Sequence, residues 1–291
     1  MEHKIQNGVL CAEFSDIGGE LLSLTDKSGL EYIWQGDAKY WDGRSPILFP
    51  YCCRLYGGHY TYHGEKYFGD IHGFIRETRF SDIENGGDFI VFKTSSNEKT
   101  RKLYPFDFEF ELKYALEGNT LKCDITVKNL GNVPLYYCEG MHPGFNVPLD
   151  KTRFEDWYLE FSSPAAPRRI LFSESKFCCG ESDFSGELEN GTRLALTHSL
   201  FDNEAIFLTG AARSVSIKSD ISQRKIVIDY PDSAAVGFWQ PEHTDAPFIC
   251  VEPLNGLPSF DGEIDDIEKK LFSRCVEPEK SHTDTVKITV F

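Results

Sequence analysis

Clustered basic residues and long apolar runs are both missing from this sequence of 291 residues. Lys and Arg number 30 against 46 Asp and Glu, which gives a formal net charge of −16. Such a chain is unsuited to general binding of nucleic-acid phosphates. No apolar stretch approaches the roughly 20 residues that span a bilayer, and the segment MEHKIQNGVL lacks the features of a signal peptide. We therefore expect a cytoplasmic protein with no nucleic-acid or membrane partner.

Cysteine spacing of the C-x-x-C type is also absent, although the chain contains nine cysteines. Two adjacent pairs occur, Cys52-Cys53 and Cys178-Cys179, and neighbouring cysteines rarely bridge each other. The odd total and the missing zinc or redox spacing indicate reduced, mostly buried thiols in a reducing compartment.

Helical periodicity is scarce, and alternation with a period of two prevails. In FDFEFELKY, residues 106–114, Phe106, Phe108 and Phe110 share one face and acidic residues the other, which is typical of a half-buried antiparallel strand. Residues 9–26, 89–96, 106–131 and 213–230 predict strands and hairpins. A helix is expected only at residues 261–273, with a short turn near residues 173–177. The pattern favours one all-β domain over residues 1–291, with two large sheets packed face to face.

Four segments place ionisable residues in apolar surroundings: SPILFPYCCRL with Arg54, GDIHGFIRETRF with His72, Arg76 and Arg79, GMHPGF with His142, and APFICVEPLNGLP with Glu252. Each has a structural explanation when taken alone, such as a hydrogen-bonded histidine or surface arginines paired with carboxylates. Together they favour a site, because a β-sandwich brings distant strand ends to one face.

Acid–base chemistry is the function that this set of residues favours. Burial raises the pKa of a carboxyl such as Glu252 and makes it a better base near neutral pH. A histidine such as His142 supplies the complementary acid. An acid and a base on opposite sides of a polyol open and close a hemiacetal ring, and Trp239 offers a flat apolar face for a sugar.

The order of LFP…R, HGFIR, MHPGF and VGFW…PFICVEP resembles the aldose 1-epimerase (galactose mutarotase-like) family, in particular its divergent bacterial branch. The resemblance covers essentially the whole chain. It implies a large antiparallel β-supersandwich with few short helices. It also implies a mutarotase that interconverts the α and β anomers of a hexose or related aldose without a cofactor.

By position, the resemblance makes Glu252 the general base for the anomeric hydroxyl and His142 the general acid for the ring oxygen. It implies that His72 and Arg54 bind the sugar. Asp202, in LFDNEAIFL, lies where the family uses an acidic residue for substrate hydroxyls, and Glu204 is its rival.

Two departures from the family pattern alter the expected pocket walls. Cys53 stands where a glycine usually precedes the arginine, and Leu254 stands where a tryptophan commonly follows the Glu-Pro pair. Relatives that act on hexose 6-phosphates use arginines for the phosphate, and Arg54, Arg76 and Arg79 are candidates for such a cluster. Arg76 is therefore counted among the substrate-binding residues.

Three alternatives stay open at this point. The first is a non-catalytic carbohydrate-binding or sugar-sensing protein on the same fold, and the second is a hexose-6-phosphate mutarotase. The third is a metal centre of His72, His142 and Glu252, although no two of them share a short ligand spacing. A serine hydrolase is disfavoured, since no G-x-S-x-G element occurs. We expect a sugar as the substrate, no cofactor or metal, and a monomer or homodimer.

Overall fold

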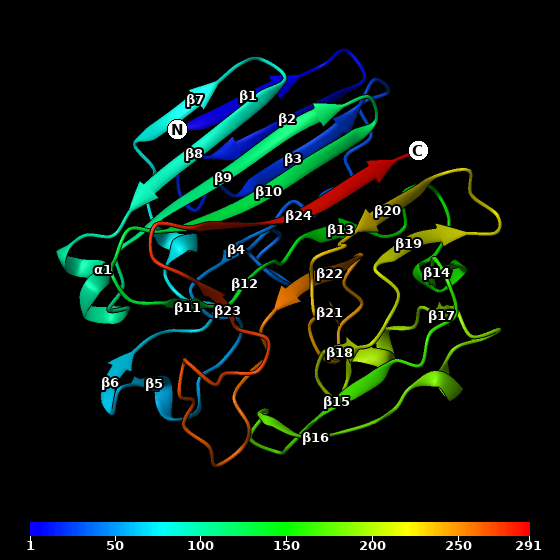
Figure 1. Ribbon diagram of the computed structural model, residues 1–291. Helices are drawn as coiled ribbons and strands as arrows, with labels where there is room; N and C mark the ends of the chain where they lie inside the picture. The colour runs from blue at the N-terminus through cyan, green and yellow to red at the C-terminus, as the bar shows by residue number, and fades with distance from the viewer.

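The structure is a computed structural model that describes residues 1–291, and it consists mainly of antiparallel β-sheets (Figure 1). The larger of the two main sheets has nine strands, in the order β17 (Arg193–Ala195), β14 (Trp157–Phe161), β19 (Ser214–Ser219), β20 (Lys225–Asp229), β24 (Ser281–Val290), β10 (Thr120–Asn129), β9 (Phe108–Glu117), β8 (Phe89–Ser95) and β7 (Asp82–Asn85).

The second main sheet has eight strands and lies below strands β7 to β10 and β24 of the first in Figure 1. Its order is β16 (Cys178–Asp183), β15 (Arg168–Phe172), β18 (Ile206–Thr209), β21 (Ala235–Trp239), β22 (Phe248–Asn255), β12 (Glu139–Met141) and β4 (Ile47–Leu48), and β13 (Gly144–Asn146) also pairs with β22. One large apolar cluster draws residues from both sheets, so the core lies between them.

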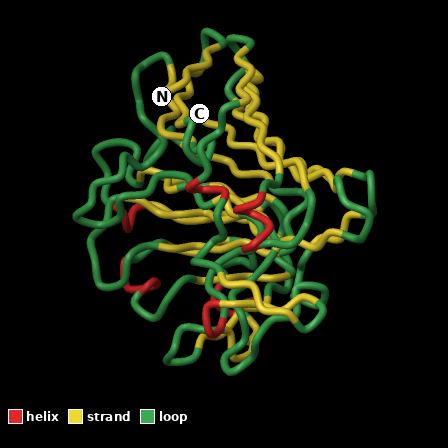
Figure 2. The backbone as a smooth tube through the Cα atoms, turned by 90° about the vertical axis from the view of Figure 1, so that its left-hand side faces the viewer, coloured by secondary structure: helices red, strands yellow, loops and turns green.

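Three small sheets complete the strand structure: β1 (Glu2–Gln6), β2 (Leu10–Ser15) and β3 (Leu21–Asp26); β5 (His59–Tyr62) with β6 (Glu65–Phe68); and β11 (Leu135–Tyr137) with β23 (Arg274–Val276). Figure 2 shows how little of the chain is helical. The helices are α1 (Glu98–Leu103) and the 3-10 turns η1 (Tyr56–Gly58), η2 (Ile75–Glu77), η3 (Phe154–Asp156), η4 (Ser185–Glu187) and η5 (His198–Phe201). None of them has the length and apolar character needed to cross a membrane.

The alternating patterns predict the strands well. In β9, Phe108, Phe110 and Leu112 are fully buried, and the glutamates between them are partly exposed. The hairpin expected around the Gly-Gly turn of residues 9–26 is formed by β2 and β3. The prediction of an all-β fold is therefore confirmed at the level of individual strands.

The helix predicted at residues 261–273 is wrong, because this segment forms turns. Its backbone pairs with a neighbouring strand instead: Thr61 N donates to Asp265 O, and Ile267 N donates to Thr61 O. Lys270 lies buried and its ammonium bonds Asp265 at 2.7 Å. These tertiary contacts outweigh the helical spacing of the apolar residues.

Candidate active site

The central strand β22 is buried on both of its faces. Ile249 and Val251 belong to the main core, whereas Phe248 and Cys250 belong to a separate aromatic cluster on the other face. Because side chains alternate along a strand, Glu252 shares the face of Phe248 and Cys250. That face carries the candidate site.

The strand opposite β22 is interrupted at His142 and Pro143. The pairs Gly140↔Leu254 and Gly144↔Cys250 have the same register on either side of the break, so His142 lies directly across from Glu252. Proline has no N–H to donate to the ladder, which explains why β12 ends at Met141 and β13 begins at Gly144. Directly opposed residues in an antiparallel pair place their side chains on the same face.

His142 and Glu252 consequently form a buried pair. The distance from His142 Nε2 to Glu252 Oε1 is 3.4 Å, and the two residues are 8% and 2% exposed. The strand on the other side of Glu252 contributes Gly237 at the paired position. A Cβ atom there would lie 2.3 Å from the Phe207 ring, so only glycine lets this ring pack beside the carboxyl.

Burial shifts the pKa values of the two groups in opposite directions. It raises the pKa of Glu252 to about 8, and the nearby Glu204 carboxylate adds to the rise. It lowers the pKa of His142 to about 4, and the positive charge of Arg76 contributes to the decrease. Both shifts favour uncharged forms, as expected in a dry environment. Between these two values, the pair as a unit carries one proton.

His72 is fixed by reciprocal hydrogen bonds with Cys53. Cys53 N donates to His72 Nδ1 at 3.0 Å, and His72 N donates to Cys53 O at 3.0 Å. Because Nδ1 accepts a hydrogen bond, the neutral ring carries its proton on Nε2. Both residues have positive φ, 60° for Cys53 and 68° for His72. A left-handed backbone favours glycine, which is consistent with the resemblance that puts a glycine at the position of Cys53.

Glu204 lies between two cations at the site. Its Oε2 atom is 3.6 Å from Arg54 Nη1 and 3.4 Å from Lys176 Nζ. Lys176 also forms an ion pair with Glu242, and Arg76 pairs with Glu77 at 3.3 Å. Each cation beside the pocket therefore already has a carboxylate partner.

These groups line one cavity with an empty volume of about 830 Å³, open solvent at its mouth included. Trp41 and Trp239 form its aromatic walls, their rings 5.5 Å apart at an interplanar angle of 77°. The basic, acidic and histidine residues around it are Arg54, His72, Arg76, His142, Lys176, Glu204 and Glu252.

The structure brings six of the seven residues expected at the site to this cavity: Arg54, His72, Arg76, His142, Trp239 and Glu252. Asp202 is not among the lining residues, because its Oδ1 accepts from His243 N at 3.0 Å and pairs with the His243 ring. The rival residue Glu204 lines the cavity instead. Arg79 is also elsewhere, since it forms an ion pair with Asp16.

Trp41 and Lys176 line the cavity but were not expected from the sequence. Trp41 lies in a segment without regular structure, and Lys176 in the turn between β15 and β16. Neither has a flanking motif, so only tertiary structure reveals them.

A metal centre is not supported by the arrangement of side chains. No group of three or more His, Cys, Asp or Glu residues has the geometry to hold an ion. His72 Nδ1, moreover, already accepts a backbone hydrogen bond.

Residues 1–288 match the aldose 1-epimerase family, and the chain belongs to that family. It is similar to the plasmid-encoded protein LacX of Lactococcus lactis subsp. lactis, with 33% identity covering 100% of this chain and 99% of the relative. The expected family is thereby confirmed.

Two solved structures agree with the expected fold. A galactose mutarotase-like protein from Lactobacillus casei has a TM-score of 0.92 and 30% identity, and all of both chains is covered. A galactose mutarotase related enzyme from Lactobacillus acidophilus has a TM-score of 0.93 and 29% identity, covering 100% of this chain and 97% of the other. The galactose mutarotase-like fold class is confirmed.

Proposed function

We propose that this protein is an aldose 1-epimerase, a mutarotase that interconverts the α and β anomers of a free aldose. The observation that carries the proposal is the buried pair of His142 and Glu252, 3.4 Å apart, in a cavity walled by tryptophan. A histidine and a carboxyl with shifted pKa values in one pocket are typical of acid–base catalysis.

The reaction needs one base and one acid. Glu252 as carboxylate takes the proton from the anomeric hydroxyl while His142 as imidazolium gives its proton to the ring oxygen. The C1–ring oxygen bond breaks and C1 becomes an aldehyde. After rotation about C1–C2, the ring oxygen attacks the other face of C1, and the two protons return. No net atom or electron is gained, so no cofactor is required.

The number of protons that His142 and Glu252 hold together is the number that this reaction needs. At neutral pH the pair holds one proton, and burial favours its position on Glu252. The reactive form has the same proton on His142. Passing it between Glu252 and Nε2 requires movement across the 3.4 Å contact. Hydroxyls of a bound sugar favour this charged form, because they replace hydrogen bonds that the dry pocket lacks.

The charges at the cavity favour a neutral aldose over a sugar phosphate. Arg54 and Lys176 are both within ion-pair distance of Glu204, so a phosphate has to compete with a carboxylate already in place. We propose that Arg54, Glu204 and the Nε2–H of His72 bind sugar hydroxyls, and that Trp239 packs against the sugar ring. A hexose-6-phosphate mutarotase is the second candidate, favoured only by the presence of Arg54, Arg76 and Lys176 at one cavity.

The test is polarimetry or proton NMR of freshly dissolved α-glucose, α-galactose and α-glucose 6-phosphate, each corrected for spontaneous mutarotation. We expect faster equilibration of a neutral sugar, and its loss in Glu252→Gln, which keeps the shape of the side chain but removes the base. The matched control is Glu139→Gln. Glu139 is also buried with its pKa raised to about 8, but it lies outside the cavity and bonds Asn255 at 2.6 Å.

Each outcome separates the candidate functions. Loss of turnover in Glu252→Gln but not in Glu139→Gln supports the epimerase. Acceleration of glucose 6-phosphate alone supports the second candidate. Sugar binding by calorimetry without acceleration of any anomer overturns the epimerase in favour of a carbohydrate-binding or sugar-sensing protein.

A further inference from the structure

The ring of His142 lacks the hydrogen bond that usually orients a catalytic histidine. Its Nε2 faces Glu252, but the buried Nδ1 atom has no hydrogen-bond partner on any other residue, and the only backbone contact of the ring is with His142 itself. In most histidine sites the second nitrogen bonds a carbonyl or carboxylate, which fixes the ring plane and the tautomer. Another interaction has to hold the ring of His142.

Three aromatic rings surround it. The Trp41 ring is 5.0 Å from the His142 ring at an interplanar angle of 34°. Trp239 meets it edge-on at 5.6 Å and 74°, and His72 does so at 5.5 Å and 88°. Trp41 is thus the ring most nearly parallel to His142, and the one whose face limits rotation of the imidazole.

The indole of Trp41 fills a slot between two glycines. A Cβ atom on Gly43 would lie 2.5 Å from the indole, and one on Gly144 would lie 3.2 Å from it. Gly144 is only two residues from His142, on the same interrupted strand. Any larger residue at Gly43 therefore displaces the indole from its place beside His142.

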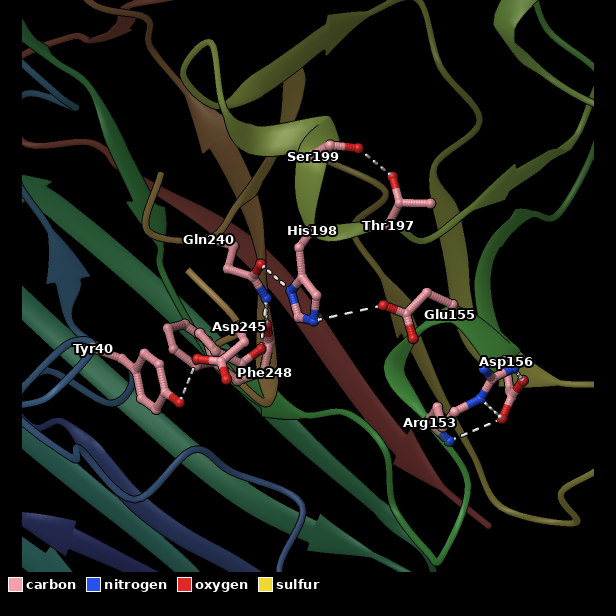
Figure 3. Close-up of polar contacts among 11 residues, drawn as sticks. Tyr40, Arg153, Glu155, Asp156, Thr197, His198, Ser199, Gln240, Asp245 and Phe248 are labelled. Atoms are coloured by element: carbon pink, nitrogen blue, oxygen red, sulfur yellow. Dashed lines mark hydrogen bonds and ion pairs between the residues drawn. The ribbon is translucent and has the colours of Figure 1, made fainter. Parts of the chain in front are cut away.

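The segment of residues 35–44, which carries Trp41, is fastened at several points. Trp34 Nε1 donates to Trp41 O at 2.8 Å. The Tyr40 hydroxyl donates to Asp245 at 2.8 Å, as Figure 3 shows. The first bond holds the segment to the residue just before it, and the second joins it to the loop between β21 and β22, the two strands that carry Trp239 and Glu252.

The buried side chain of Gln240 holds the base of that loop in turn. Its amide donates to Ala246 O at 2.8 Å and to Phe248 O at 2.6 Å, while its oxygen contacts His198 at 2.7 Å (Figure 3). The aromatic wall beside His142 is therefore a fixed part of the fold.

We propose that Trp41 is a positioning residue for the mutarotase reaction: packed between Gly43 and Gly144, it fixes the ring plane of His142 so that Nε2 faces Glu252. This inference rests on the proposed function. It assigns to packing what a hydrogen bond at Nδ1 achieves in other histidine sites. Loss of the indole frees the imidazole to rotate and admits water beside it.

The test compares Trp41→Ala and Trp41→Phe with Trp157→Phe. Trp157 is a buried tryptophan of β14 that does not line the cavity, so its variant controls for general loss of packing. We expect Trp41→Ala to lower kcat by a factor on the order of 10–10². Trp41→Phe, with a flat ring in the slot, restores most of the rate. Trp157→Phe keeps the wild-type kcat per folded molecule.

Two further readouts separate positioning from simple destabilisation. In Trp41→Ala, we expect the pH at which kcat falls on the acid side to move upward, because water beside His142 relieves the burial that lowers its pKa. NMR titration of the His142 ring measures the same change without any turnover. The proposal is overturned if Trp41→Ala has the same kcat as the wild type, the same pH at which kcat falls on the acid side, and the same titration of the His142 ring. If wild type accelerates no anomer, the epimerase proposal fails, and the NMR titration alone decides the role of Trp41.

Discussion

The pH dependence expected for the proposed epimerase follows from the number of protons that the His142–Glu252 pair holds. Below a pH of about 4 both groups are protonated, and above about 8 neither is. Only the singly protonated pair contains one acid and one base. We therefore expect a bell-shaped profile of kcat/KM, the parameter that reports the free protein.

The width of the bell-shaped profile is set by the difference between the two apparent pKa values of the pair. With apparent pKa values of about 4 and 8, the singly protonated pair makes up roughly 98% of the protein at pH 6, half at either limb and about 9% at pH 9. The sign follows from burial: Glu252 keeps its proton to a higher pH than a free carboxyl, and His142 loses its proton at a lower pH than a free imidazole. The active range is thus wider than that of the same groups in water.

The profile of kcat/KM against pH is obtained from initial rates at low sugar concentration. These rates are measured by polarimetry from pH 3.5 to 9.5, and the spontaneous rate is subtracted at each pH. The variant Glu204→Gln sharpens the test, because the Glu204 carboxylate helps to raise the pKa of Glu252. Its alkaline limb should move to lower pH. A flat kcat/KM between pH 7 and 9.5 in wild type would refute a role for the Glu252 proton in the reaction.

Three other predictions concern the pair, its support and the core. His142→Asn should lower kcat by a factor on the order of 10²–10⁴ through loss of the general acid. Polarimetry of the folded variant measures this decrease. Gly237→Ala should lower both kcat and the melting temperature, since its Cβ would lie 2.3 Å from the Phe207 ring; wild-type values for both would contradict this packing. Phe49→Ala should destabilise the protein by about 3–5 kcal/mol, whereas Phe68→Ala, at a 60% exposed position, should stay within about 0.5 kcal/mol in urea denaturation.

The strands were predictable from the sequence because a half-buried strand shows its environment in its own residues. The alternation of Phe108 and Phe110 with acidic residues indicates one solvent-exposed face and one buried face. The segment of residues 261–273 shows where this approach fails. Ile264, Ile267 and Leu271 have helical spacing, yet the backbone pairs with Thr61 instead. Local pattern contains no information about such a distant partner.

The same reasoning explains which site residues were found. His142 and Glu252 interrupt apolar runs, so their presence in a strand is conspicuous. Asp202 and Glu204 are two residues apart in one loop, and only the path of that loop decides that Glu204 reaches the cavity while Asp202 pairs with His243. Trp41, in turn, is one aromatic residue among many until the fold places its ring over His142.

The strand that carries His142 connects these features. On the side of β22, Pro143 has no N–H to donate, although its carbonyl accepts from Val251 N at 3.2 Å. On the other side, His142 N donates to Pro46 O at 3.0 Å and Gly144 N donates to Arg44 O at 2.8 Å, which continues the register that pairs Gly140 of β12 with Leu48 of β4. The end of the segment that carries Trp41 is thereby joined to this strand beside His142. One strand thus carries the candidate acid, pairs with the strand of the candidate base and anchors the segment that carries the indole.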